Sequence, residues 1–471
     1  MGKRVVIYRR RSSKINLIKG FFFLSLALFI CSAFLFIYRQ RSSFRDWIKK
    51  PLVYKIYITD DLRSEFQPKI DQYRKLHPEI KIEYSQNDPK IIIDFYPKDH
   101  YQNFLIKKIP SLILSATGQK RLLRPEKNYW FISQKIDKNI LDLENYLKSF
   151  YRQDSVITLN AVGDIIPGRT VALKMAQKGT NYPFSPIAPY TKEADIVYGD
   201  LECPLSDRIP PPYEGMSFIA PSSTISGLKL CGINVVSLAN NHSTNFGSEV
   251  FLDTFSLLKE NKIKYFGGGR NEQEAFEPLF FKVKGLKIAF LNYNSIIGGI
   301  KAEDTTPGVA WIKLKPWAEE DDKNDIERMK KVVQKAKEKS DIVIVCFHWG
   351  VEYQTKPIES QINVAHAAIE SGASLVIGTH PHVVQAIEYW QSPKDKTKNG
   401  FIAYSLGNFV FDQMWSEETR EGVILKCKFF NKDLSEVELL PYKIEDYCQP
   451  NLLDQNAGRH IIERIFSASN L

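Results

Sequence analysis

The sequence predicts an α/β fold for most of the chain, and three observations lead to this prediction. The chain has 471 residues, 44% of them hydrophobic and 25% charged, so it is long enough to bury a large core. From about residue 155, short apolar runs alternate with polar or glycine-rich loops and helix-like segments. These runs are apolar at nearly every position, which is typical of strands covered on both faces.

The region before residue 155 predicts a smaller α/β module at residues 53–150. Its strand-like runs read VYKIYIT, EIKIEYS and KIIIDFY. A helical pattern, LRSEFQPKIDQYRKL, lies between the first and second runs. We find no pattern there that indicates a particular chemistry, so the role of this module stays open.

The larger region, residues 155–445, predicts seven strands in chain order. They are expected at residues 156–162, 195–198, 233–239, 286–293, 341–347, 374–378 and 401–406. Residues 326–340 predict an amphipathic helix, because acidic and amide residues that favour a helix start come directly before them. Residues 422–444 predict a closing β-hairpin, and residues 446–471 follow as a C-terminal tail.

An uncharged apolar run at residues 20–38 predicts one transmembrane helix. Its 19 residues, at about 1.5 Å each, cross roughly 30 Å of hydrocarbon. A cleaved signal peptide is the alternative, but the run is longer than a usual signal and no A-x-A-like site follows it. Seven basic residues precede the run and five follow, which favours a cytoplasmic tail at residues 1–19 and a large domain outside the membrane.

The net charge of +10 belongs to the flanks of this run. Residues 1–50 hold twelve Lys and Arg against Asp46 alone, a charge of +11, so the other 421 residues carry −1. No general electrostatic case for nucleic-acid binding remains. The five cysteines after Cys31 are scattered and odd in number, so they predict no disulfide framework.

Polar residues follow the ends of five expected strands. They are Asp164, Asp200, Glu202, Asn241, His242, His348, His380 and His382. Each alone has an ordinary explanation as a turn, a helix cap or a core histidine. Together they lie at the carboxyl ends of strands, where α/β sheets bind ligands. Carboxylate, amide and imidazole donors suit Mn, Fe, Zn or Mg, and two divalent ions could share this set.

The segments GDIIPGR, YGDLECPLS, LANNH, FHWGVEY and GTHPH resemble the motif series of the calcineurin-like metallophosphoesterases. With SLGNFVFDQ, residues 155–445 look most like the CapA family of that superfamily, which acts in capsule and poly-γ-glutamate synthesis. The resemblance implies an α/β/β/α sandwich. It also implies the metal ligands Asp164, Asp200, Glu202, Asn241, His348, His380 and His382.

The resemblance implies individual roles as well. Asp200 corresponds to a carboxylate that bridges two metals, although Glu202 competes with it. His242 would act as general acid, next to the amide ligand Asn241. Arg169 would hold an anionic group of the substrate, since a guanidinium binds carboxylate or phosphate with two parallel bonds.

One departure weakens the comparison with other metallophosphoesterases. Ile166 stands where those proteins place a histidine ligand. Three functions therefore stay open: a part in synthesis, export or release of an anionic polymer such as poly-γ-glutamate; a metal-dependent phosphomonoesterase or phosphodiesterase; and a non-catalytic binding module. The expected partners are the membrane, the polymer or phosphoester, and a capsule-synthesis complex.

Overall fold

A computed structural model describes residues 156–469 except 212–214, 396, 431 and 455, and the short segments 5–8, 52–58, 75, 80–84, 91–93 and 130–132. The chain divides into two compact units, residues 5–155 and residues 156–471 with 1–4. No helix among the described residues is long and apolar enough to cross a membrane. The span predicted at residues 20–38 lies outside the described residues.

The smaller unit contains the three strands expected from the sequence. They are β2 (Leu52–Ile58), β3 (Ile80–Tyr84) and β4 (Ile91–Ile93), which form a parallel sheet in the order β3-β2-β4. Two short strands, β1 (Val5–Tyr8) and β5 (Trp130–Ile132), pair antiparallel. The helix expected between β2 and β3 lies outside the described residues except for Lys75.

The first sheet of the larger unit has a parallel half and an antiparallel half. The parallel half is β6 (Val156–Ile165), β7 (Ile196–Leu201), β8 (Val235–Ser237) and β9 (Lys264–Phe266), in that order. On the other side of β6 come the antiparallel strands β19 (Glu421–Phe430), β20 (Asp433–Glu445) and β21 (Gln449–Leu452). The hairpin of β19 and β20 confirms the one expected at residues 422–444.

The second sheet is parallel at its centre. Its order is β11 (Leu279–Val283), β12 (Leu286–Asn294), β14 (Ile342–His348), β15 (Leu375–Thr379), β17 (Asn399–Ala403) and β16 (Ile387–Gln391). Only the two edge strands, β11 and β16, pair antiparallel with their neighbours. All seven strands predicted after residue 155 are therefore confirmed, with bounds shifted by up to three residues.

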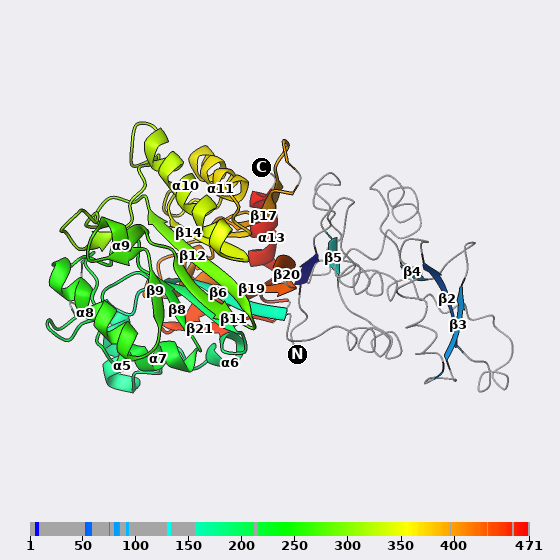
Figure 1. The fold of residues 1–471 in the computed structure, drawn as a ribbon. Helices are drawn as coiled ribbons and strands as arrows, with labels where there is room; N and C mark the ends of the chain where they lie inside the picture. Colours follow the sequence, from blue (N-terminus) through cyan, green and yellow to red (C-terminus); the bar gives the residue numbers. More distant parts are fainter. Residues whose placement is uncertain are drawn as a thin grey trace. The chain divides into compact units, whose positions relative to one another are not determined.

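The helices lie outside the two sheets. Those of seven residues or more are α5 (Arg169–Lys178), α7 (Thr224–Leu230), α8 (Gly247–Glu260), α10 (Lys323–Lys339), α11 (Glu359–Glu370) and α13 (Arg459–Ala468). Helices α10 and α11 cover the second sheet, and α7 and α8 lie beside the first (Figure 1). The predicted helix is confirmed as α10, which the Asp322 side chain caps by accepting from two backbone N–H groups.

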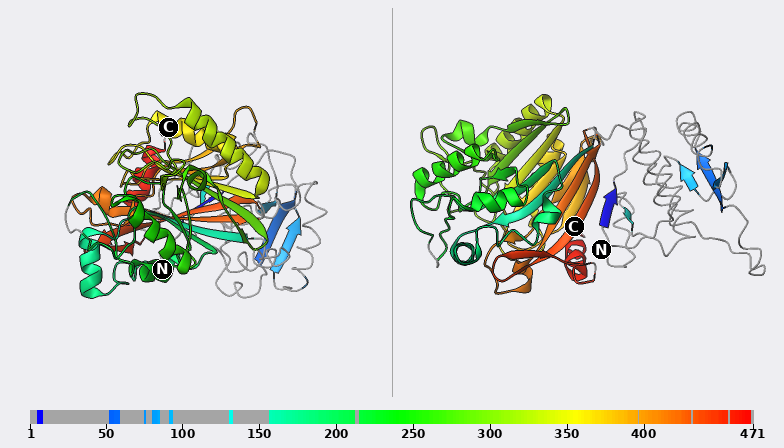
Figure 2. Two further views of the ribbon diagram at one scale, coloured as in Figure 1. Left: turned by 60° about the vertical axis from the view of Figure 1, so that its left-hand side comes forward. Right: turned by 90° about the horizontal axis from the view of Figure 1, so that it is seen from below.

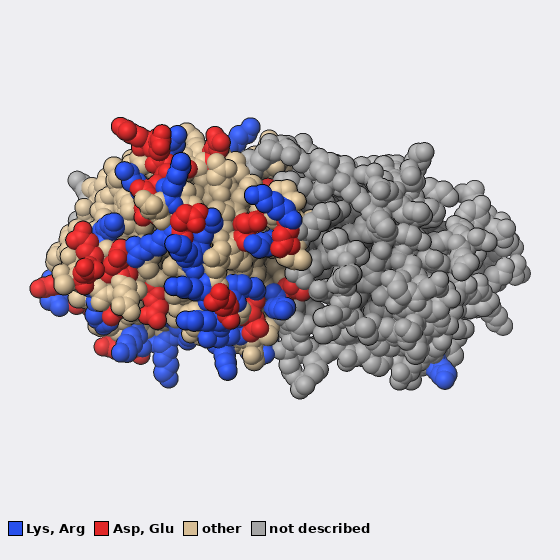
Figure 3. Space-filling view, turned by 45° about the horizontal axis from the view of Figure 1, so that its top comes forward, with Lys and Arg blue, Asp and Glu red and all other residues tan. Residues whose placement is uncertain are grey.

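Short elements complete the larger unit. They are α6 (Ala188–Thr191), α9 (Glu272–Phe276), α12 (Glu417–Arg420), β10 (Gly268–Gly269), β13 (Gly308–Val309) and β18 (Asn408–Val410). Strand β18 pairs parallel with the end of β6. On the face in Figure 3, Lys and Arg are interspersed with Asp and Glu over this unit.

The two sheets pack face to face around one apolar core. The ring of Phe290 on β12 lies 6.2 Å from Tyr198 on β7 and 5.3 Å from Phe266 on β9, measured between centroids. Figure 2 shows the sheets as neighbouring layers within the helices. Burial of such large rings stabilises this packing, at about 25 cal/mol for each Å² of apolar surface removed from water.

Residue 163, directly before Asp164, has room only for glycine. A Cβ atom there would lie 1.7 Å from the carbonyl oxygen of Gly407, which precedes β18. The N–H of Asp164 donates to this same oxygen over 3.2 Å. The close contact of two backbones therefore fixes the end of β6 against the segment that leads into β18.

We expect Gly163→Ala to lower the free energy of unfolding by about 3 kcal/mol, because a neighbouring backbone has to move. Gly179→Ala is the control: its Cβ meets nothing within 4 Å, although its φ is +101°. Backbone strain alone makes us expect a cost of about 1 kcal/mol there. Urea unfolding of the full chain measures both. Equal costs in the two variants would contradict the close-contact explanation.

Candidate metal centre

Strand register places Asp164, Asp200 and His348 at the carboxyl ends of neighbouring strands. In the first sheet Asp164 on β6 is paired with Asp200 on β7, and Asp200 with Ser237 on β8. In the second sheet His348 on β14 is paired with Thr379 on β15. Because the two sheets face each other, the carboxyl ends of these parallel strands meet at one rim.

The predicted ligands form two overlapping groups at this rim. One group is Asp164, Asp200, Glu202 and His348, and the other is Glu202, His380 and His382. Within each group, one donor atom per residue lies within 4.8 Å of every other. All of these residues are buried, and Glu202 alone belongs to both groups. Glu202 is therefore the carboxylate that the two groups share.

Asp200 is held largely by the protein itself. Its Oδ1 accepts hydrogen bonds from the Ser237 hydroxyl over 2.5 Å and from the Asn240 amide over 3.3 Å. Its Oδ2 lies 3.0 Å from Nδ1 of His348. A carboxylate that binds one ring nitrogen fixes the other nitrogen toward a metal. Asp200 thus orients His348, as a residue behind a metal ligand does.

The outer nitrogen of His348 faces two further predicted ligands. Nε2 lies 2.7 Å from Oδ1 of Asn241 and 3.4 Å from Oε1 of Glu202. Burial alone would lower the pKa of His348, but the carboxylates of Glu202 and Asp200 outweigh burial and raise it to about 10. The Asn241 amide and the Glu202 carboxylate therefore both lie next to the His348 imidazole.

Glu202 has no hydrogen-bond donor for its carboxylate. Both oxygens are buried and accept no hydrogen bond, and Nε2 of His348 is near without suitable geometry. Burial, and then the nearby charge of Asp164, raise the pKa of the Glu202 carboxyl. Leaving a buried carboxylate unsatisfied is costly, and a divalent cation would supply the missing partner.

His380 shows the same lack of partners among the nitrogen donors. Neither Nδ1 nor Nε2 of its buried ring makes a hydrogen bond. Burial, and then the charge of His348, lower the pKa of His380 well below its ordinary value. A neutral ring with a free nitrogen lone pair is the form that ligates metals. A bound metal ion would therefore give the His380 ring and the Glu202 carboxylate the interaction that no hydrogen bond of the protein provides.

His382 lies on the Asp164 side of the centre. Its Nδ1 is 3.4 Å from Oδ2 of Asp164 and 2.9 Å from Oδ1 of Asn408. Burial would lower the pKa of His382, but Glu202 and Asp164 raise it to about 9. Sequence analysis did not single out Asn408 as a site residue. The SLGNFVFDQ segment that contains it was the available signal.

His242 lies at the margin of the centre. Its Nδ1 is 2.9 Å from Oδ1 of Asn245, so Nδ1 carries the proton and Nε2 is the basic nitrogen. Burial is the main reason that the pKa of His242 falls to about 4. The ring is therefore neutral near pH 7. A role as general acid stays a prediction. Asn245, which sets this tautomer, was not anticipated from the sequence.

Arg169 is near the centre but already engaged. Its guanidinium pairs with Asp412 and donates from Nη1 to the Gly215 carbonyl over 2.9 Å. It also lies over the rings of Phe218 and Phe411, 4.7 and 5.2 Å from their centroids. To bind a substrate carboxylate with two bonds, the guanidinium would have to release Asp412.

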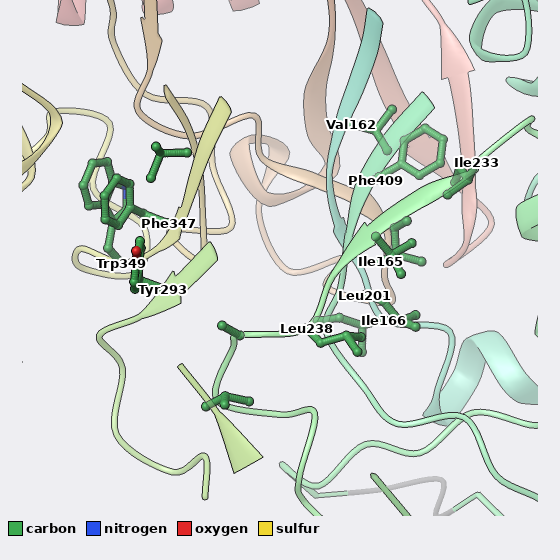
Figure 4. Close-up of a cluster of buried hydrophobic side chains, with 14 of the residues drawn as sticks. Val162, Ile165, Ile166, Leu201, Ile233, Leu238, Tyr293, Phe347, Trp349 and Phe409 are labelled. Carbon is green, nitrogen blue, oxygen red and sulfur yellow. The ribbon is translucent and has the colours of Figure 1, made fainter. Parts of the chain in front are cut away.

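Ile166 takes no part in the centre. It is buried in the apolar core together with Leu201 and Leu238, and Figure 4 shows it among these side chains. Two further histidines are used elsewhere: His366 contacts Glu388, and His460 contacts Glu421. The centre thus receives no ligand from position 166.

The sequence also matches a described protein family over this part of the chain. Residues 158–413 match the family model of the bacterial capsule synthesis protein PGA_cap. The chain belongs to this family. The match extends over every predicted ligand from Asp164 to His382 and over Asn408.

Curated relatives of this PGA_cap chain carry related names. It is 30% identical over 305 residues to the "Capsule biosynthesis protein CapA" of Bacillus anthracis, covering 63% of this chain and 69% of the relative. It is also 30% identical over 322 residues to the "PGA biosynthesis protein CapA" of Bacillus subtilis (strain 168), covering 67% and 80%. The CapA resemblance predicted from the motifs is therefore confirmed.

The residues of the PGA_cap domain fit a centre for divalent metal ions. Carboxylate, amide and imidazole donors converge, and neither the Glu202 carboxylate nor the His380 ring makes a hydrogen bond. No thiol belongs to either group. Such a donor set is consistent with a divalent metal ion.

We expect Glu202→Gln to remove most bound metal, because a neutral amide replaces the carboxylate shared by both groups. Asp200→Asn is expected to weaken metal affinity by about 10- to 100-fold, the usual effect of losing a residue that orients a ligand. Metal content after dialysis, measured by mass spectrometry, tests both variants.

The control is Glu388→Gln, which changes a buried carboxylate that binds His366 and Tyr404 outside the centre. This variant should keep the metal content of the unchanged protein. Equal metal loss from Glu388→Gln and Glu202→Gln would contradict the assignment.

Proposed function

We propose that this protein acts in the synthesis, export or release of an anionic surface polymer such as poly-γ-glutamate. The observation that supports this most is a buried centre in a chain of a capsule-synthesis family. Neither the Glu202 carboxylate nor the His380 ring in this centre makes a hydrogen bond. The names of the two Bacillus relatives, which refer to capsule and PGA biosynthesis, support the same class of polymer. The polymer would bind at this centre.

A bound divalent cation would supply Lewis acidity there, neutralising negative charge on a substrate oxygen. The chain's own residues would keep this centre ordered. Asp200 fixes the ring of His348, and Asn408 fixes that of His382. His242, neutral and held by Asn245, would accept a proton from a water molecule or a substrate group at the margin.

The anionic group of the polymer would bind the metal centre in preference to Arg169. Asp412 already pairs with the guanidinium, and the Arg169 side chain is only 17% exposed. Arg169 would instead position two rings, since Phe218 packs on His242 at 4.5 Å and Phe411 on His382 at 5.5 Å. Direct binding of a polymer carboxylate by Arg169 stays the alternative role.

A metal-dependent phosphomonoesterase or phosphodiesterase is the second candidate. The neutral ring of His242 beside a set of metal donors favours it, since phosphoester hydrolysis needs both. The burial of Ile166 in the apolar core speaks against it, because no histidine ligand comes from that position. A binding module without catalysis is the third candidate.

Full-length protein in detergent, loaded with Mn²⁺, is expected to bind poly-γ-glutamate, and chelation should abolish binding because the carboxylates would lose their cation. Calorimetry measures binding, and polymer length after incubation detects cleavage. Glu202→Gln should lose binding, and Glu388→Gln should keep it.

Release of nitrophenol from an aryl phosphate that disappears in His242→Ala would favour the phosphoesterase instead. Metal-independent polymer binding would contradict the proposed site. Polymer binding without cleavage would favour the non-catalytic module.

We further propose that residues 20–38 anchor the protein with its N-terminus in the cytoplasm and the PGA_cap domain outside, where a capsule-synthesis complex would meet it. The support is the uncharged run and the basic residues that flank it. Protease added to intact cells or protoplasts should then digest the PGA_cap domain and spare an N-terminal tag. Protection of the PGA_cap domain until the membrane is permeabilised would contradict this orientation.

A further inference from the structure

Exposed aromatic side chains lie next to the candidate metal centre. Large hydrophobic side chains exposed in the described part of the chain are Tyr190, Ile209, Met216, Ile297, Trp317, Tyr353, Trp415 and Tyr447. Single exposed residues of this kind are ordinary on a protein surface. Three of them are different, because their rings join the histidines of the centre.

These rings form one row that passes through the centre. Trp317 lies 6.4 Å from His380, and His380 lies 5.7 Å from His382, between ring centroids. His382 lies 6.3 Å from Tyr353, and Tyr353 lies 4.6 Å from Trp415. We call these five residues the aromatic row. The two predicted ligands are in the middle, and exposed rings stand at both ends.

Hydrogen bonds hold two of the exposed residues of the row, Trp317 and Tyr353. Nε1 of Trp317 donates to the Gly350 carbonyl over 3.2 Å, and the N–H of Tyr353 donates to the Pro381 carbonyl over 2.8 Å. The Tyr353 hydroxyl accepts from the Gln413 amide over 3.3 Å. Fixed rings lose little conformational freedom when a ligand binds, so they are suited to recognition.

Three residues of the aromatic row have strained backbone conformations. Non-glycine residues with positive φ include Tyr353 at 65°, His380 at 94° and His382 at 58°, all members of the aromatic row. Such conformations are uncommon and cost free energy, and proteins keep them mainly where function requires a side chain in a given direction. The strain of these three residues therefore favours a functional role for the row.

The arrangement of the row indicates an extended ligand. Trp415 contacts Tyr353 and neither histidine of the row, so a small ester at His382 would meet Tyr353 first. A polymer bound at the centre would be long enough to contact Trp317, Tyr353 and Trp415 together. In a poly-γ-glutamate chain, methylene groups and planar amides separate the carboxylates, and aromatic faces pack well on both.

We propose that Trp317, Tyr353 and Trp415 bind the methylene and amide parts of poly-γ-glutamate next to the unit held at the centre. These residues would set specificity for polymer over short ligands. This inference rests on the proposed function and adds to it the residues that recognise chain length.

The test compares long poly-γ-glutamate with a γ-glutamyl dipeptide, using full-length Mn²⁺-loaded protein and calorimetry. Trp415→Ala and Trp317→Ala should each weaken polymer binding by about tenfold, the equivalent of one lost ring contact. Dipeptide affinity and metal content should not change in Trp415→Ala. Trp415→Phe should restore most of the polymer affinity, because it keeps an aromatic face.

Tyr190→Ala is the matched control, since Tyr190 is 43% exposed, Tyr353 41%, and Tyr190 is no member of the row. It should bind polymer as the unchanged protein does. If Trp415→Ala and Trp317→Ala also bind polymer like the unchanged protein, the binding role of the aromatic row is contradicted. The proposed function is not affected by that result.

If the unchanged protein binds no poly-γ-glutamate, the proposed function fails and the inference fails with it. Dextran and phosphatidylglycerol vesicles are the comparison ligands. Tryptophan-dependent binding to either of them, without such binding to poly-γ-glutamate, would overturn the assigned ligand class.

Discussion

A buried carboxylate without a hydrogen-bond donor is the constraint on which the rest of this site depends. Glu202 is fully buried, and it belongs to both groups of donors at the rim. Its charge can be kept there only beside a strong positive partner, because burial away from water is so unfavourable. The neighbouring imidazoles and carboxylates are arranged so that a divalent cation is the natural partner.

The two sheets make this arrangement possible. The first sheet contributes Asp164 and Asp200, and the second contributes His348, on strands that end at the same rim. Aromatic packing, as between Tyr198 and Phe290, holds the two sheets together. A shift of either sheet would separate the oxygen donors from the imidazoles, so the core determines the geometry of the centre.

Around the ligands, a set of polar residues controls orientation. Asp200 fixes His348, Asn408 fixes His382 and Asn245 fixes His242. Arg169 has a similar orienting role. Its guanidinium pairs with Asp412 and lies over Phe218 and Phe411, the two rings that pack on site histidines. Residues of this kind shape a centre without touching the substrate, and their loss is expected to weaken metal binding.

The sequence by itself determined seven strands and the closing hairpin of the larger unit, the helix α10, the family and the eight polar residues of the rim, because apolar runs and the residues that end them are local patterns. It did not predict strands such as β9, β11 and β16. It could not decide between Asp200 and Glu202, since their roles depend on which donors the opposite sheet brings near. The partners Asn245, Asn408 and Asp412, and the aromatic row with Trp415, were also decided by tertiary structure alone. These contacts join segments that the chain separates, and only the packing of the two sheets brings them together.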